Sequence, residues 1–250
     1  MSRIILEICV DDAAGIDAAT RGGADRIELC AALGLGGLTP SVGLIALAAE
    51  NALPTMAMIR PRGGDFVWSA DEIRAMCAEI DAVRAAGLAG IVIGASLPDG
   101  RLDAAALAEL VARAQGLDIT LHRAIDLVPD VTEAMNLCQR LGINRVLSSG
   151  GAKAAELGLD RLSEMAQSGI TVMPGGGVNT KNLARFAADL SLREIHASAS
   201  VLLPLPDDPR IADFGFQSSG ARGTDEATVR ALRAALDHMG TDHHRDVAVP

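Results

Sequence analysis

Residues 4–10 read IILEICV and residues 26–30 read RIELC, and in both stretches branched apolar residues alternate with residues that can ionise. Alternation with a period of two is typical of a β-strand whose two faces meet different surroundings. Each strand-like run is followed by an Ala-rich stretch that is typical of a helix. The same unit recurs, with strand-like runs that begin near Ile4, Arg26, Thr55, Gly90, Asp118, Arg145, Ile170 and Glu194.

The spacing of these runs predicts the fold. Successive runs begin 22 to 35 residues apart, which accommodates a strand, a loop and a helix. Parallel strands need such crossovers, and the helices then cover the outside of the sheet. Eight units in 250 residues predict one α/β domain, a single (β/α)8 TIM barrel over residues 1–250. Within it we expect a long loop over 199–224, a C-terminal helix over 225–239 and a flexible tail over 240–250.

Strand parity predicts which side chains point into the barrel. Alternate side chains of a barrel strand face the interior, and the apolar set belongs under the helices. On the first two strands this rule places Glu7, Cys9, Glu28 and Cys30 inside. On later strands it adds inward groups, namely Arg60, His122, Glu194, His196 and Ser198. Because catalytic groups of this fold lie at the carboxyl ends of the strands, we expect a site there.

The inward groups include candidates for acid–base chemistry. Burial raises the pKa of a carboxyl group, so Glu7 or Glu28 could act as a base, and His122 could be an acid, a base or a ligand. Asp126 could orient His122 or a neighbouring Arg, or it could simply cap the turn. His196 completes the candidate catalytic set. The alternative is a salt-bridged plug that only closes the barrel.

Loops after several strands carry groups suited to an anion. Arg60 and Arg62 flank a Gly-Gly turn and could clamp an anion, although Arg62 could instead brace the loop by pairing with Asp65. Glycine turns after strands six and seven let backbone N–H groups approach an anion, or they serve only as tight connections. The candidate anion-binding residues are Arg60, Arg62, Ser149, Gly176, Gly177 and Ser198.

The cysteines suggest a second kind of chemistry. Cys9 and Cys30 are expected on adjacent strands, which lie about 5 Å apart, so two thiolates could hold one soft ion such as Cu(I). Ordinary buried cysteines are the alternative. Cys77 and Cys138 fall on the apolar stripes of helices and are expected in the core.

Composition excludes several partners. A net charge of −10 would repel nucleic acid and acidic membranes, and the sequence has no run of Lys and Arg. No window approaches the about 18 apolar residues of a membrane span. Four cysteines in 250 residues do not form a disulfide scaffold. We therefore expect a cytoplasmic protein that binds a metal ion or a small anionic ligand.

Several motifs together resemble the CutC family. They are ExC at 7–9, GADRIELC at 23–30, GGLTPS at 36–41, IRPRGGDF at 59–66, HRA at 122–124 with Asp126, SG at 149–150, GGGV at 175–178 and ExH at 194–196. They occur in order from about residue 4 to 200. Leu121 departs from the family's usual Phe, and the chain beyond Ala199 matches less distinctively.

The resemblance implies a cytoplasmic β/α barrel, a homo-oligomer such as a dimer or tetramer, and a role in copper homeostasis. It also implies that Cys9 and Cys30 are the copper ligands. Three functions follow as hypotheses: a Cu(I)-binding homeostasis protein, a barrel enzyme on a small anionic or phosphorylated substrate, and an interaction protein without catalysis. The groups at the barrel mouth leave open whether the protein is an enzyme.

Overall fold

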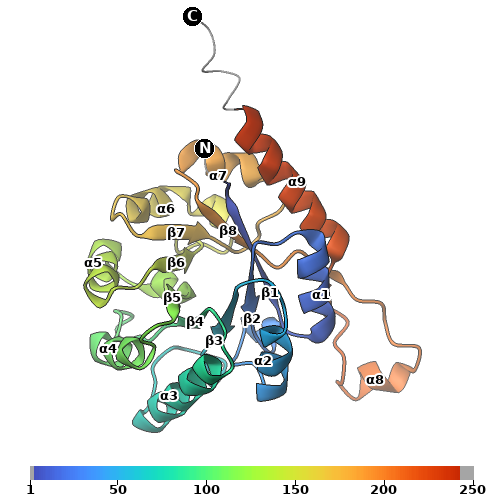
Figure 1. Ribbon diagram of the computed structural model, residues 1–250, viewed down its shortest axis with the longest axis horizontal. Coiled ribbons are helices and arrows are strands. Elements are labelled where there is room, and N and C mark those ends of the chain that lie inside the picture. Colours follow the sequence, from blue (N-terminus) through green and yellow to red (C-terminus); the bar gives the residue numbers. More distant parts are fainter. Residues whose placement is uncertain (1–2, 243–250) are drawn as a thin grey trace, which may run out of the picture.

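In a computed structural model that describes residues 3–242, eight parallel strands form a nearly closed barrel with helices around it (Figure 1). The hydrogen-bonded order is β7-β6-β5-β4-β3-β2-β1-β8, and β8 lies next to β7 at the seam. The TIM-barrel prediction is therefore confirmed, and every expected strand start lies within one residue of the observed one. The strands are β1 (Ile5–Val10), β2 (Arg26–Leu29), β3 (Thr55–Met58), β4 (Gly90–Ile93), β5 (Asp118–Leu121), β6 (Arg145–Ser148), β7 (Thr171–Pro174) and β8 (Glu194–Ala197).

Helices cover the outside of the barrel, and their starts follow local capping rules. The Ser69 side chain accepts from the Glu72 N–H while the Glu72 carboxylate accepts from the Ser69 N–H, a reciprocal capping box that starts α3. No helix within residues 3–242 is long and apolar enough to cross a membrane. The helices of the barrel are α1 (Ala13–Gly22), α2 (Val42–Ala49), α3 (Ala70–Ala85), α4 (Ala104–Arg113), α5 (Val131–Leu141), α6 (Leu159–Ala166), α7 (Leu183–Asp189) and α9 (Glu226–Asp242).

The main hydrophobic core lies between the barrel and the helices. On β1 the apolar residues Leu6, Ile8 and Val10 are fully buried in this core, as the strand parity predicts. Cys138 belongs to the same core, and the half-buried Cys77 packs against it. Alternate residues of β1 therefore face the barrel interior, where the ionisable groups described below lie.

A layer of buried ion pairs fills the barrel where several strands begin, and we call it the ionic layer. Arg26 donates to Glu7 (Nε to Oε2, 2.5 Å) and to Glu194, and Arg145 also donates to Glu194. Arg145 further bonds Asp118 at 3.0 Å. The plug that sequence analysis held as an alternative thus exists, but it occupies this level only.

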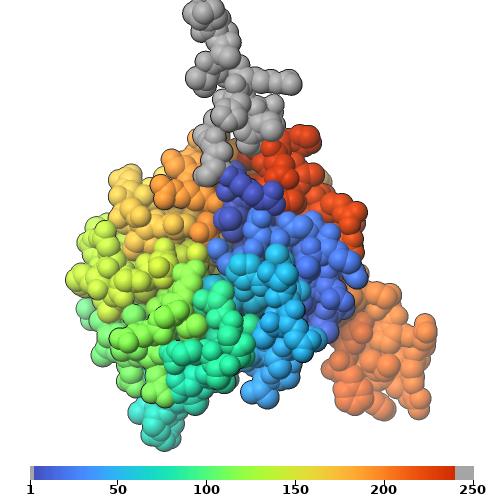
Figure 2. All heavy atoms as spheres, viewed as in Figure 1, coloured from blue at the N-terminus to red at the C-terminus, as the bar shows by residue number. Residues whose placement is uncertain are grey.

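Residues 200–224, expected to be part of a long loop, form an arm with secondary structure of its own. Strands β9 (Ser200–Leu202) and β10 (Arg222–Thr224) pair antiparallel, and the short helix α8 (Pro209–Asp213) lies between them. The arm stands out from the body of the barrel (Figure 2). Short strands were missed there because Pro and Gly residues interrupt the apolar pattern.

The C-terminal helix is longer than expected. Helix α9 continues to Asp242, so residues 240–242 are helical, which contradicts that part of the expected tail. The remainder of the tail, 243–250, lies outside the described residues.

Candidate metal and anion site

A cavity of about 630 Å³ opens at the carboxyl-terminal ends of the barrel strands. Its walls come from the ends of β1 and β2, the loops after β3, β5 and β7, the end of β8 and the root of the arm. Its volume falls in the range of about 300–1,000 Å³ that small-molecule sites occupy. The absence of an open cavity, which would have favoured an interaction protein without catalysis, is therefore not observed.

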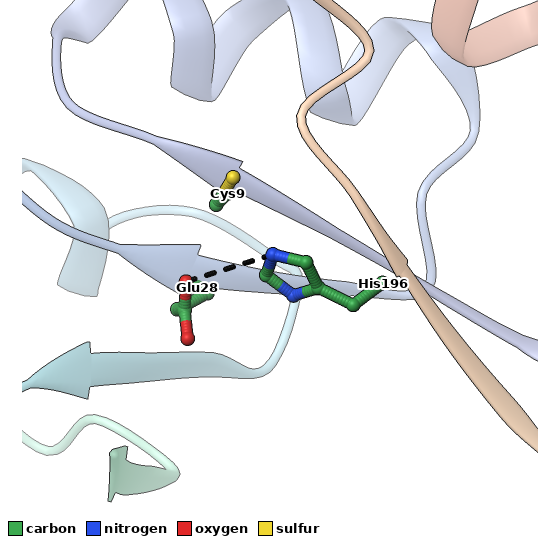
Figure 3. A group of neighbouring side chains, drawn as sticks. All are labelled: Cys9, Glu28 and His196. Atoms are coloured by element: carbon green, nitrogen blue, oxygen red, sulfur yellow. Dashed lines mark ion pairs between the residues drawn. The ribbon is translucent and has the colours of Figure 1, made fainter. Parts of the chain in front are cut away.

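Three side chains that can bind a metal meet in this cavity, and we call them the metal cluster (Figure 3). Cys9 on β1, Glu28 on β2 and His196 on β8 are all buried, and their donor atoms lie within 4.8 Å of one another. The strand register explains the meeting, because Cys9 is paired with Glu28 and Glu7 is paired with both Arg26 and His196. Their inward parity then brings the side chains together inside the barrel.

His196 is held in a fixed orientation from behind. Its Nδ1 donates to Oε1 of Glu7 at 2.8 Å, and its Nε2 lies 3.8 Å from Oε2 of Glu28. Burial alone would lower the pKa of His196, but the charge of Glu28 and the bond to Glu7 outweigh it and raise this pKa well above its usual value. In the metal-free protein Nε2 therefore carries a proton, which a metal ion would have to displace.

The two buried glutamates have opposite environments. Burial would raise the pKa of Glu7, but the hydrogen bond from His196 and the charge of Arg26 lower it to about 2. Burial raises the pKa of Glu28, whose Oε1 has no hydrogen-bond partner among the described residues. Glu28 lines the cavity and Glu7 does not, so only Glu28 can meet a ligand directly.

Cys30, expected to bind the metal together with Cys9, is not one of the three clustered residues. Its side chain is inside the barrel, in a small apolar group with Met56, Met58 and Val92. Its thiol donates to Oε2 of Glu28 over 3.6 Å, and burial raises its pKa well above the usual value. Cys30 is therefore a protonated thiol that contacts the carboxylate of the metal cluster, Glu28.

His122 lines the cavity, and one nitrogen of its ring is buried without a partner among the described residues. Its Nδ1 accepts from the N–H of Ala124 at 3.1 Å, while its buried Nε2 has no partner among residues 3–242. Burial, with a smaller contribution from the charge of Arg60, lowers its pKa to about 3. The ring is thus neutral near pH 7, with its proton on Nε2, because Nδ1 is occupied as an acceptor. The ring packs against Phe66 with centroids 4.6 Å apart.

Asp126 caps the loop after β6 and does not contact His122. It accepts from Ser148 Oγ at 2.6 Å, from the Gly151 N–H at 3.0 Å and from Arg123 Nε at 2.8 Å. Ser149 bonds the same carboxylate through its N–H and its hydroxyl, and it does not line the cavity. Asp126 thus orients the neighbouring Arg123, one of the expected roles, and also caps a loop; neither Asp126 nor Ser149 lines the cavity.

The two arginines of the loop after β3 have different positions. Arg60 lines the cavity, but its Nη1 donates to the carbonyls of Leu35 and Gly37 and its Nη2 to that of Gly64. Arg62 lies outside the cavity and pairs with Asp65 at 2.9 Å and with Glu72 at 2.6 Å. Arg62 therefore braces its loop. Arg60 brings its charge to the cavity wall, and its buried Nε has no partner among the described residues.

Gly176, Gly177 and Ser198 do line the cavity, as the anion prediction requires. Sequence analysis missed two further cationic residues there, Arg123 after β5 and Arg222 on β10. Arg123 is the residue after His122 in the HRA motif, and it lies in a short helical turn where strand parity gives no direction. Arg222 lies in the arm, which was expected to be a loop.

Comparison with known proteins agrees with these observations. A model of the CutC family matches residues 4–201. The chain belongs to the CutC family. A CutC-family protein of Rhizobium meliloti (strain 1021) is 51% identical over 240 residues, covering 95% of this chain and 98% of its own. One of Agrobacterium fabrum is 50% identical, covering 97% and 96%. The family prediction is thus confirmed, and the family model ends where the arm begins.

Solved structures place the CutC chain in the same fold. A CutC from Streptococcus agalactiae, provisionally described as a copper homeostasis protein, superposes with a TM-score of 0.74 at 27% identity, covering 78% of this chain and 98% of its own. The N-(5'-phosphoribosyl)anthranilate isomerase of Pyrococcus furiosus has a TM-score of 0.58 at 12% identity, covering 94% and 99%. The second likeness shows the shared barrel fold alone.

Proposed function

We propose that this CutC-family protein binds copper as Cu(I) and serves in copper homeostasis, with the ion as its cargo. The observation that carries the proposal is the metal cluster, in which a thiol, an imidazole and a carboxylate lie within 4.8 Å of one another in a cavity open to solvent. The role itself is the one given to the Streptococcus agalactiae relative.

The donor set fits a soft ion best at Cys9 and His196. Thiolate and imidazole are good ligands for Cu(I), whereas carboxylate is a harder ligand. A metal-binding His usually donates its other N–H to a carboxylate, and Glu7 occupies that place behind His196. Met58 also lines the cavity and offers a soft thioether. Glu28 would then accept the proton that leaves the cluster or complete the coordination.

An anaerobic Cu(I) titration against a chromogenic competitor tests this assignment. Cys9→Ser should bind Cu(I) at least about ten-fold more weakly than the wild type, since it loses the thiolate ligand. Cys138→Ser is the matched control, because Cys138 lies in the outer core and should leave the affinity unchanged. Cys30→Ser should change the affinity far less than Cys9→Ser. If Cys9→Ser binds Cu(I) as the wild type does, the site is misassigned.

Two further properties belong to this proposal. We propose a cytoplasmic location, which the four free cysteines support because thiols persist in a reducing compartment. We also propose a homo-oligomer. Its support is the arm, where Leu205, Phe214 and Phe216 are all more than 60% exposed, a cluster of apolar side chains that favours association.

The second candidate function is a barrel enzyme that acts on a small anionic substrate at the same face. A specific observation favours it: the cavity is much larger than one ion needs, and Arg60, Arg123 and Arg222 all line it. A copper site alone gives no reason for three guanidinium groups. The two candidates are compatible if the cavity binds both a metal ion and an organic anion.

A further inference from the structure

The loop after β7 presents unused backbone donors to the cavity. Gly176 and Gly177 line it with φ of +102° and +74°, a conformation that favours glycine. No acceptor among residues 3–242 takes the N–H of Gly176, Gly177 or Val178. Successive free N–H groups at a turn form a concave binding site for an anion.

Arg123 adds a preoriented cation beside this loop. Its Nε donates to Asp126 at 2.8 Å and its Nη2 to Ser149 Oγ at 2.6 Å. Its Nη1 makes no bond to the described residues and lies beside Gly176, since a Cβ on that glycine would be 3.6 Å from it. Two tethers therefore hold the guanidinium with one nitrogen free for a ligand.

The charges of the cavity agree with an anionic ligand. Arg60, Arg123 and Arg222 outnumber Asp11 and Glu28 on its walls, in a chain whose net charge is −10.

We propose that the N–H groups of Gly176 and Gly177, together with Arg123 Nη1, form a subsite for the phosphate group of a small phosphate monoester. The inference rests on the second candidate function and names its substrate class. Donors from two loops suit a tetrahedral dianion with three free oxygens better than a planar carboxylate with two. The rest of the cavity then holds the organic part of the ligand.

Calorimetric titration of the metal-free protein, in buffer without phosphate or sulfate, tests the subsite. Glycerol 3-phosphate and glycerol differ only in the phosphate group, and we expect binding of the first and none of the second. Inorganic phosphate should bind at least about ten-fold more weakly than glycerol 3-phosphate. Equal affinity for inorganic phosphate would overturn the inference that the ligand is organic, and no binding of either phosphate would overturn the subsite.

Variants test which residues hold the phosphate. Arg123→Gln should weaken glycerol 3-phosphate binding at least about ten-fold, a change equal to about 1.4 kcal/mol. Arg62→Gln is the matched control, because it removes a loop arginine paired with carboxylates outside the cavity. Equal weakening by Arg123→Gln and Arg62→Gln would contradict the assignment. Because no copper is present, these results and those of the Cu(I) titration fail or succeed independently.

Discussion

Nδ1 of His196 donates a hydrogen bond of 2.8 Å to Oε1 of Glu7, and this bond directs Nε2 of the same ring toward Cys9 and Glu28. Glu7 is in turn held by Arg26 of the ionic layer. The orientation of a cavity side chain is therefore fixed by ion pairs that never reach the cavity. Through Glu7, the ionic layer therefore helps to orient a side chain of the metal cluster.

The first prediction concerns Glu7. Glu7→Gln should lower Cu(I) affinity about 10- to 100-fold, the usual effect of losing a carboxylate that orients a ligating His. The competitor titration measures it on protein whose fold is checked by circular dichroism. Glu194→Gln, which changes another carboxylate of the ionic layer without touching His196, is the comparison. Equal affinities for Glu7→Gln and the wild type would show that the orientation of His196 is unimportant for copper.

The ionic layer itself should matter for stability. Arg26→Met leaves Glu7 without its cation, and breaking such a buried pair costs about 3–5 kcal/mol. Arg74→Met breaks an exposed pair with Asp71 and should cost less than about 1 kcal/mol. Urea unfolding of both variants measures the difference. Similar losses in the two would mean that burial adds nothing to these ion pairs.

The neutral His122 predicts a pH dependence of folding. Its pKa falls from 6.5 to about 3 on folding, so below 6.5 the unfolded chain binds the proton more tightly and stability decreases as the pH falls. Between pH 7 and pH 5 this group alone should remove about 2 kcal/mol from the free energy of unfolding. His122→Leu should lose correspondingly less stability over the same interval. Parallel pH profiles for the two proteins would refute the assignment.

Gly94 makes room for His122. A Cβ at this position would overlap Cε1 and Nδ1 of the His122 ring. Gly94→Ala should therefore cost about 1–3 kcal/mol of stability. Gly43→Ala, on α2, places its Cβ no closer than 4.0 Å to a neighbour and should not destabilise the protein. Normal stability in Gly94→Ala would mean that the two residues are not in this contact.

The proposed homo-oligomer can be tested at the arm. Phe214 and Phe216 stack edge to face at its exposed surface, with ring centroids 6.1 Å apart. The double variant Phe214→Ser/Phe216→Ser should keep its free energy of unfolding within about 0.5 kcal/mol yet sediment as a smaller species. Leu157→Ser, an equally exposed apolar position on the barrel, is the control. An unchanged sedimentation coefficient in the double variant would argue against the arm as the interface.

Strand-level features followed directly from the sequence. The alternation of apolar residues located the strands. Parity correctly placed Glu7 and Cys9 inside the barrel because one face of β1 is apolar and packs under the helices. Applied two residues before Glu28 on β2, the same rule would have placed Arg26 inside the barrel as well. Its carboxylate partners on β1 and β8 would then have indicated the ionic layer.

Depth within the barrel could not be predicted in the same way. Cys9 and Cys30 share the inward parity, yet the register pairs Cys9 with Glu28, so Glu28 and His196 reach the cluster and Cys30 does not. Register depends on how all eight strands stagger around the closed sheet, which no single strand encodes. Arg123 escaped prediction for a different reason, since a helical turn after a strand follows no alternation.

The ionic layer limits how ligands can enter and leave the barrel. The side chains of the ionic layer fill the barrel interior below the metal cluster. A ligand that enters at the carboxyl-terminal mouth must therefore leave through the same opening. If the proposals for copper and for an organic phosphate both hold, a phosphate at the loop after β7 would lie nearer the mouth than a copper ion at the metal cluster. Loading and unloading would have to follow a fixed sequence, with the later arrival leaving first.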